Sequence, residues 1–155
     1  VTLRKERLAE FRAFMETALS EDVANSRHDN ELFIDGAVSA RSLTAEFANT
    51  LNRAGPFGAA NPEPVIALPA HQLVYADEVG QAHLRVRFKS GDGAIVNGIA
   101  FRSVGQKLGH ALTQNRGQPL HVAGSLAVDR FQGSERVQLR VLDVAVPDPG
   151  PAVIR

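Results

Sequence analysis

The sequence predicts a mostly β protein with flanking helices, and three features of the chain carry this prediction. Downstream of residue 64 the apolar residues alternate with polar ones in short runs separated by glycine-bearing turns, as in strands. Upstream of residue 55 they recur every three or four residues, as on one face of a helix. Between these halves lies a joint over residues 55–64, where three prolines and two glycines allow neither element to continue.

The N-terminal segment, residues 1–54, is expected to form a helix, a short strand and a second helix. The first helix is expected to end in a polar turn over residues 25–30, and its apolar stripe consists of Leu8, Phe11, Met15 and Leu19. Residues 32–38 alternate as a strand does. The second helix has Ser42 as its predicted N-cap and Gly55 as its stop, and its apolar face carries Leu43, Phe47 and Leu51.

Five strands and one helix are expected after the joint. They are strands over residues 65–76 (interrupted at Pro69), 83–89 and 94–101, a helix from Ser103 to about Asn115, and strands over 120–128 and 136–146 that flank a hairpin loop at 131–134. A helix between the third and fourth of five strands is the order of an OB-fold barrel, although a small open sheet has the same order. Barrel closure would bury Leu84, Val86, Phe88, Val137, Leu139 and Val141. The predicted barrel domain covers residues 65–147, and a flexible tail follows over 148–155.

Composition excludes several classes of protein. The 155 residues suffice for one hydrophobic core, and the absence of cysteine excludes disulfides, thiolate nucleophiles and thiolate zinc sites. The lack of cysteine fits a cytoplasmic protein. No apolar run has the length of a membrane span or of a signal peptide's core, so no membrane partner is expected.

The net charge of zero hides an uneven distribution. Residues 1–63 carry seven Lys and Arg against ten Asp and Glu, whereas residues 64–155 carry ten against seven. Residues 82–140 alone hold nine cations and three acids, which predicts a local basic field of the kind that attracts nucleic acid.

The strongest binding pattern lies on the predicted strand 83–89. Arg85, Arg87 and Lys89 project from one side of it about 7 Å apart, close to the spacing of successive phosphates. A second alternating set, Arg136, Gln138 and Arg140, would extend the site if its strand lies beside the first, and Arg102 belongs to the same basic region. The pattern also fits an ordinary solvated face whose cations discourage aggregation.

No catalytic pattern is visible in the sequence. The five histidines show no metal-ligand spacing. Gly91-Asp92-Gly93 precedes a strand rather than a helix, so it predicts a hairpin turn and not a dinucleotide loop. We therefore expect no catalytic residue, metal site or cofactor in this chain.

The joint itself is expected to be a packed structural loop, with Phe57 buried between the helical segment and the barrel; its glycines would alternatively let it contact a phosphate. Its defining residues are Pro56, Phe57, Gly58, Asn61, Pro62 and Pro64. This run resembles the signature that precedes the OB domain of RecJ-type single-strand-specific DNA exonucleases. Similar residues occur in the family's order at Ile34-Asp35-Gly36, His83-Leu84-Arg85, Gly98-Ile99-Ala100-Phe101, Gly133, Val137-Gln138-Leu139 and Asp143.

The resemblance implies that the chain is the C-terminal part of a 5′ to 3′ exonuclease that serves recombination and repair in the cytoplasm. Its partners would be single-stranded DNA, held by the OB domain, and the upstream catalytic domains of the same parent chain. In the family those domains bind manganese or magnesium through aspartate and histidine motifs, which this sequence does not contain. The alternative is a non-catalytic OB-type module that binds partner proteins and whose cations only keep it soluble.

Overall fold

The computed structural model describes residues 4–28, 31–131 and 134–148 and divides the chain into two compact units, Val1–Leu32 and Phe33–Arg155. The first unit consists of a 3-10 turn, η1 (Lys5–Arg7), and helix α1 (Leu8–His28). The predicted turn at residues 25–30 is wrong over its described part, because α1 continues through Asn25 to His28. No proline or glycine stands there, and the polar residues present cost a helix only about 0.7 kcal/mol each or less.

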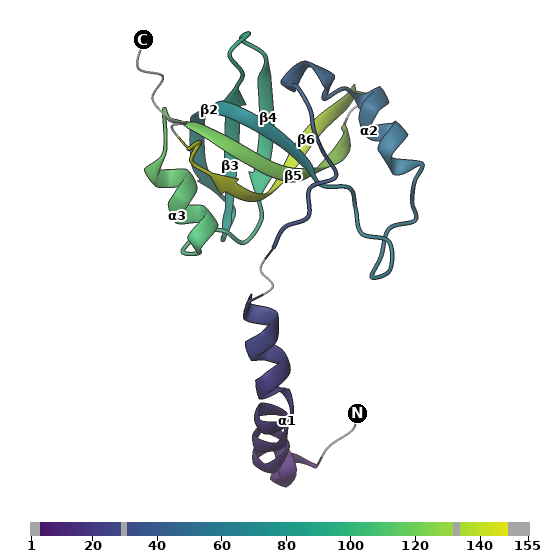
Figure 1. The fold of residues 1–155 in the computed structure, drawn as a ribbon, viewed down its shortest axis with the longest axis vertical. Coiled ribbons are helices and arrows are strands. Elements are labelled where there is room, and N and C mark those ends of the chain that lie inside the picture. Colours follow the sequence, from purple (N-terminus) through teal and green to yellow (C-terminus); the bar gives the residue numbers. More distant parts are fainter. Residues whose placement is uncertain (1–3, 29–30, 132–133, 149–155) are drawn as a thin grey trace. The chain divides into compact units, whose positions relative to one another are not determined.

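The second unit contains a closed β-barrel built from the elements that the sequence predicts, in the predicted order (Figure 1). They are β2 (Ile66–Val79), β3 (His83–Lys89), β4 (Ile95–Ala100), α3 (Lys107–Gln114), β5 (Pro119–Phe131) and β6 (Ser134–Ala145). The strands pair in the order β2-β3-β4-β6-β5, and β5 pairs again with β2, which closes the barrel. Only β4 and β6 pair in parallel within this ring. Closure confirms the OB-fold prediction and excludes the open sheet.

Strand β2 makes closure possible because it changes partner along its length. Its first half pairs with β5, and its second half pairs with β3. The register with β5 shifts between Leu68 and His71, where Ala70 has a φ of 50°. Pro69 has no N–H to donate to a ladder, so the irregularity falls at the interruption predicted from the sequence.

The inner side chains of the strands form one core. Its largest fully buried members include Phe88, Leu68, Leu73, Leu84, Leu112, Leu120 and Leu139. Of the six residues predicted to lie inside, Val137 is only half-buried and the other five are buried. Helix α3 packs against β2 and β6, and its Leu112 joins the core.

The segment before the joint lies on the barrel. Strand β1 (Gly36–Ala37) pairs in parallel with β2, so only two residues of the predicted strand 32–38 are in a ladder. After the short turn η2 (Ala40–Ser42), helix α2 (Ala45–Asn52) packs against β5 and β6. The sequence therefore predicted this helix, although Leu43 lies before its start. It overestimated the strand, whose apolar residues Leu32 and Ile34 are exposed.

Both predicted N-caps are wrong. Helix α2 is capped by Thr44, whose Oγ1 accepts a hydrogen bond from the Phe47 N–H at 3.1 Å, because Ser42 is still part of η2. Helix α3 starts after Gln106 without a side-chain cap. Ser103 is instead buried and donates its hydroxyl to the Ala100 carbonyl at 2.9 Å.

Two expectations fall on residues that the structure does not describe. The hairpin loop predicted at 131–134 includes residues 132–133, and all of the predicted tail except residue 148 lies outside the described ranges. Within those ranges, no helix combines the length and apolar character that crossing a membrane requires.

Candidate nucleic-acid interface

Strand β3 separates the apolar and basic side chains of its sequence onto two faces. Leu84, Val86 and Phe88 are at most 1% exposed and point into the core. Arg85, Arg87 and Lys89 are exposed on the outer face. Successive side chains of a strand point to opposite faces, so the three cations form one outward row along β3, as predicted.

The second basic set does not lie beside the first, because β4 separates β3 from β6. The register nevertheless aligns one residue of each set. Arg85 is opposite Ile99 on β4, and Ile99 is opposite Arg140 on β6. Two strand spacings place the Cα atoms of Arg85 and Arg140 roughly 10 Å apart on the outer face. Elsewhere on β6, Arg136 is exposed opposite Asp129, and Gln138 is half-buried opposite Ala127.

The cations of β3 differ from other arginines of the barrel unit in their partners. In the described ranges Arg85, Arg87 and Lys89 form no ion pair. The side chain of Arg87 donates from Nε to Asn97 Oδ1 at 3.2 Å.

Three arginines outside β3 each bind an acid. Arg116 pairs with Asp77 at 2.8 Å, Arg140 pairs with Glu63 at 3.5 Å, and Arg41 pairs with Asp92. Arg140 is therefore less available to a ligand than the sequence suggested, whereas the β3 cations have no ion pair within the described ranges.

Other exposed side chains share the outer face with these cations, and none of them was among the predicted site residues. Tyr75 on β2 is opposite Arg87 and 37% exposed, and Asn97 on β4 is opposite Arg87 on the other side. Ile95 is opposite Lys89 and is also exposed. Only the register between strands brings these residues to Arg87 and Lys89, so no signal within one strand could have identified them.

One end of β3 carries a ring pair and the predicted Arg102. The rings of His83 and Phe101 meet edge to face with centroids 5.2 Å apart, and Phe101 is 51% exposed. The Arg102 N–H donates to His83 Nδ1 at 2.8 Å, and Arg102 has a φ of 50°. Its side chain is exposed at this end of the strand.

The turn after Lys89 is fixed by the Asp92 carboxylate. Ser90 and Arg41 donate side-chain hydrogen bonds to it, and the Ala94 N–H donates at 3.2 Å. These hydrogen bonds, from Ser90 first and then from Arg41 and Ala94, hold the pKa of Asp92 well below its usual range. The predicted hairpin turn at Gly91-Asp92-Gly93 is thus tied to η2 through Arg41.

The joint is organised by its own hydrogen bonds. Asn61 donates from Nδ2 to the carbonyls of Ala54 and Pro56, each at 3.1 Å, and its backbone exchanges hydrogen bonds with Gly58. Asn61 thus binds a carbonyl just beyond α2, a structural role that needs its amide donor. Phe57 is half-buried rather than buried, and it lines a small hollow with residues of α2 and β5, including Leu51 and Leu126.

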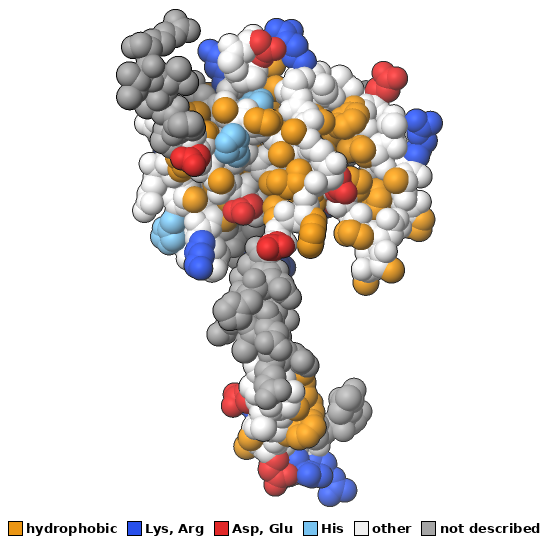
Figure 2. All heavy atoms as spheres, viewed as in Figure 1, with side chains coloured by type: hydrophobic (Ala, Val, Ile, Leu, Met, Phe, Trp, Pro, Cys, Tyr) orange, Lys and Arg blue, Asp and Glu red, His pale blue; other side chains and the backbone are white. Residues whose placement is uncertain are grey.

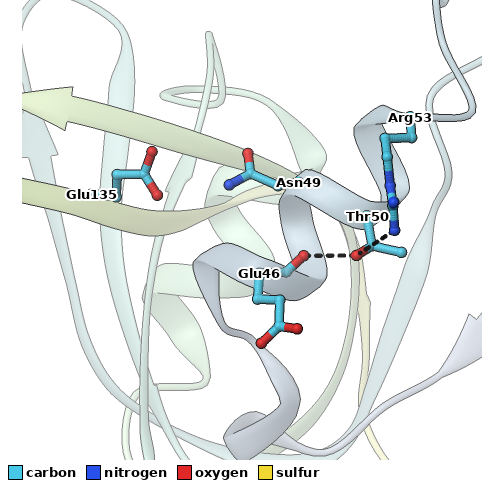
Figure 3. A pocket seen from close by; sticks show the side chains of 5 residues that line it. All are labelled: Glu46, Asn49, Thr50, Arg53 and Glu135. Carbon is cyan, nitrogen blue, oxygen red and sulfur yellow. Dashed lines mark hydrogen bonds between the residues drawn. The ribbon is translucent and has the colours of Figure 1, made fainter.

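A larger hollow of about 630 Å³ lies beside α2 (Figure 3). Its lining residues are Glu46, Asn49, Thr50, Arg53 and Glu135. Arg53 donates to the Thr50 hydroxyl, and the two carboxylates do not converge on one point in the figure. One cation and two acids do not suit a polyanion, so this hollow is not part of the candidate interface.

The described residues contain no group of three histidines, aspartates, glutamates or cysteines that could hold a metal ion. They do not fit a catalytic manganese or magnesium site.

The face of the barrel unit seen in Figure 2 shows scattered apolar side chains with cations toward its margins.

Comparison with known proteins identifies the same domain. The family model described as the RecJ OB domain matches residues 34–143. The single-stranded-DNA-specific exonuclease RecJ of Dickeya dadantii is 30% identical over 142 residues, which are 91% of this chain and 24% of that protein. The RecJ of Escherichia coli is 28% identical, over 90% of this chain and 23% of its own length. The chain thus spans about a quarter of these relatives.

Solved structures agree on the fold. The crystal structure of RecJ in complex with Mn²⁺ from Thermus thermophilus matches with a TM-score of 0.57 at 18% identity, covering 95% of this chain and 20% of that one. The Mg²⁺ complex from the same organism matches with a TM-score of 0.54 at 19% identity, covering 95% of this chain and 21% of that one. The family model covers well over half of the chain, and the chain therefore belongs to the RecJ OB domain family.

Proposed function

We propose that this barrel binds single-stranded DNA and holds the incoming strand for a RecJ-type 5′ to 3′ exonuclease. The parent enzyme would act in recombination and repair in the cytoplasm. Its hydrolytic site would lie in upstream domains that use manganese or magnesium. Membership of the RecJ OB domain family supports this proposal, as do the names of the relatives, which are single-stranded-DNA-specific exonucleases.

The observation that carries the proposal is the row of cations on β3 that have no ion pair within the described ranges. A cation already paired with a carboxylate gains little from a phosphate, because binding must first break the existing pair. Arg85, Arg87 and Lys89 have no such cost, and they lie on the strand that is second in the OB barrel. Strands two and three form the usual oligonucleotide-binding face of this fold.

Bases would contribute less than phosphates. Tyr75 and Phe101 are the two exposed aromatic side chains described on or beside the outer face of β2, β3 and β4. A base stacked on an aromatic ring contributes about 1–3 kcal/mol to binding, so these two rings cannot replace the electrostatic part of the binding energy. We therefore expect weak binding with little sequence preference.

The competing proposal is a protein-interaction module. Exposed apolar side chains on and just after β6, Leu142 at 47% and Val146 at 63%, favour it because they lie outside the basic row. In that case the cations of β3 would only solubilise the barrel, and binding to an oligonucleotide would be absent at any salt concentration.

A salt titration separates the two functions. Fluorescence anisotropy of a labelled single-stranded oligonucleotide is measured with this chain at several salt concentrations, with the matching duplex as a control. Three to five phosphate contacts predict that log K falls with log salt with a slope of roughly −2 to −4. No detectable binding at about 50 mM salt would refute the DNA-binding proposal and leave the protein-interaction module.

A further inference from the structure

An acid lies directly beside the basic row. Asp77 on β2 is the cross-strand partner of Arg85 on β3. Side chains at such positions have Cβ atoms about 4.5–5.5 Å apart, so the Asp77 carboxylate is within reach of the Arg85 guanidinium. An ion pair between them would remove Arg85 from the charge available to a phosphate.

Asp77 is bound by a different arginine. Arg116, in the segment between α3 and β5, places Nη2 2.8 Å from Asp77 Oδ1. The same nitrogen also donates to the Ala76 carbonyl, so the guanidinium is held by two acceptors on β2. Arg85 forms no ion pair within the described ranges even though it is the cross-strand neighbour of Asp77.

We propose that Arg116 is a positioning residue of the DNA-binding face, which holds Asp77 so that Arg85 remains free for a phosphate. The inference rests on the proposed function, because it assigns Arg116 a role in that site. Arg116 need not touch DNA. Its effect on binding passes through Asp77 to Arg85 and therefore requires Arg85. An arginine that contacted a phosphate itself would not depend on Arg85 in this way.

Removing Arg116 therefore frees Asp77 to pair with Arg85. One lost phosphate contact corresponds to a salt slope flatter by about 0.7 and to roughly five- to tenfold weaker binding at about 50 mM salt. We expect Arg116→Ala to show this loss although the β3 row is unchanged. Lys107→Ala is the matched control, because it removes one exposed cation of the same unit without touching Asp77.

A double-mutant cycle tests the mechanism. In an Arg85→Ala background, Arg116→Ala should change affinity by about twofold or less, since the residue through which it acts is gone. Adding Asp77→Asn to Arg116→Ala should return the affinity and the salt slope to those of the parent, because no carboxylate then remains to pair with Arg85. Arg116→Gln, which keeps a donor for the Ala76 carbonyl without the charge, serves as a second variant if melting curves show that Arg116→Ala does not fold.

The outcomes separate this inference from the proposed function. If Arg85→Ala weakens binding but Arg116→Ala weakens it by the same factor in both backgrounds, Arg116 contacts DNA directly and the inference is wrong. If Arg116→Ala binds as the parent does, Asp77 does not capture Arg85 and the inference is also wrong. If Arg85→Ala itself has no effect, the proposed binding face fails, and the role of Arg116 fails with it.

Discussion

Gly124 shows how closely β5 and β6 approach each other. It lies on β5 opposite Val141, next to a register shift between the strands. A Cβ added at this position would lie 2.2 Å from the Arg140 carbonyl oxygen and 3.1 Å from a Leu139 methyl carbon. The nearest clash is with backbone, so rotation of a side chain cannot relieve it. The backbone that positions Arg140 thus depends on the absence of a side chain at residue 124.

Gly124→Ala should lower the free energy of unfolding by about 3 kcal/mol, since β6 must move away from β5. Urea unfolding of the two proteins measures the difference. Gly91→Ala is the control, because a Cβ there meets nothing within 4 Å, and it should change stability by about 0.5 kcal/mol or less. Equal stabilities for the two variants would show that the strands are not in close contact.

Within single elements, the sequence predicted those features that depend on the residues of one strand or helix alone. Strand β3 was predicted with its bounds and both faces, because Leu84 and Arg85 begin a strict alternation that only a two-sided strand explains. The α2 cap was missed because Ser42 and Thr44 are both favoured capping residues, and the turn η2 decides between them.

In the candidate site, too, the sequence predicted only the features that belong to a single strand. The β3 cations follow from the pattern of a single strand. The alignment of Arg85 with Arg140, the placement of Tyr75 beside Arg87, and the pairing of Arg116 with Asp77 depend on register and loop packing. No local pattern encodes these contacts, because their residues lie far apart in the sequence.

The contact between η2 and the turn after β3 should respond to acid. Folding lowers the pKa of Asp92, so the ionised carboxylate stabilises the folded state at neutral pH. That contribution is lost as the pH falls below the ordinary aspartate value of about 3.9 toward the lower folded value. Asp92→Asn should therefore reduce stability at pH 7, and its difference from the parent should shrink below about pH 4.

Urea unfolding of the parent and of Asp92→Asn at several pH values measures this difference. Asp143→Asn is a suitable control, since Asp143 is also exposed but accepts only from the Val144 N–H next to it. A stability difference for Asp92→Asn that remains constant from about pH 7 to pH 3 would contradict the ionic role of Asp92.

Over the whole molecule, a net charge of zero coexists with a basic row on β3 because nearby acids are paired with other arginines. The acids around this face, Asp77, Asp92 and Glu63, each pair with an arginine that lies outside β3. The closed barrel sets the register of β2, β3, β4 and β6, and this register determines which of these side chains lie opposite one another. The proposed strand-holding role needs this surface and no catalytic group.

The chain alone should therefore leave DNA intact. Labelled single strands incubated with the pure protein and manganese should release no nucleotides, because the described residues offer no cluster that could hold a metal ion and activate water. Release that a point substitution within this chain abolishes would show a catalytic site here and contradict the assignment as a strand-holding part.

If the β3 cations track phosphates, Arg85→Ala/Arg87→Ala removes two phosphate contacts. The control is Arg4→Ala/Lys5→Ala, which removes two exposed cations from the N-terminal unit. Anisotropy with a labelled single strand across salt concentrations should show a slope flatter by about 1.4 for the β3 variant, with weaker binding, and the parent's slope for the control. If the β3 variant keeps the affinity and slope of the parent, this strand is only a solvated face and does not bind DNA.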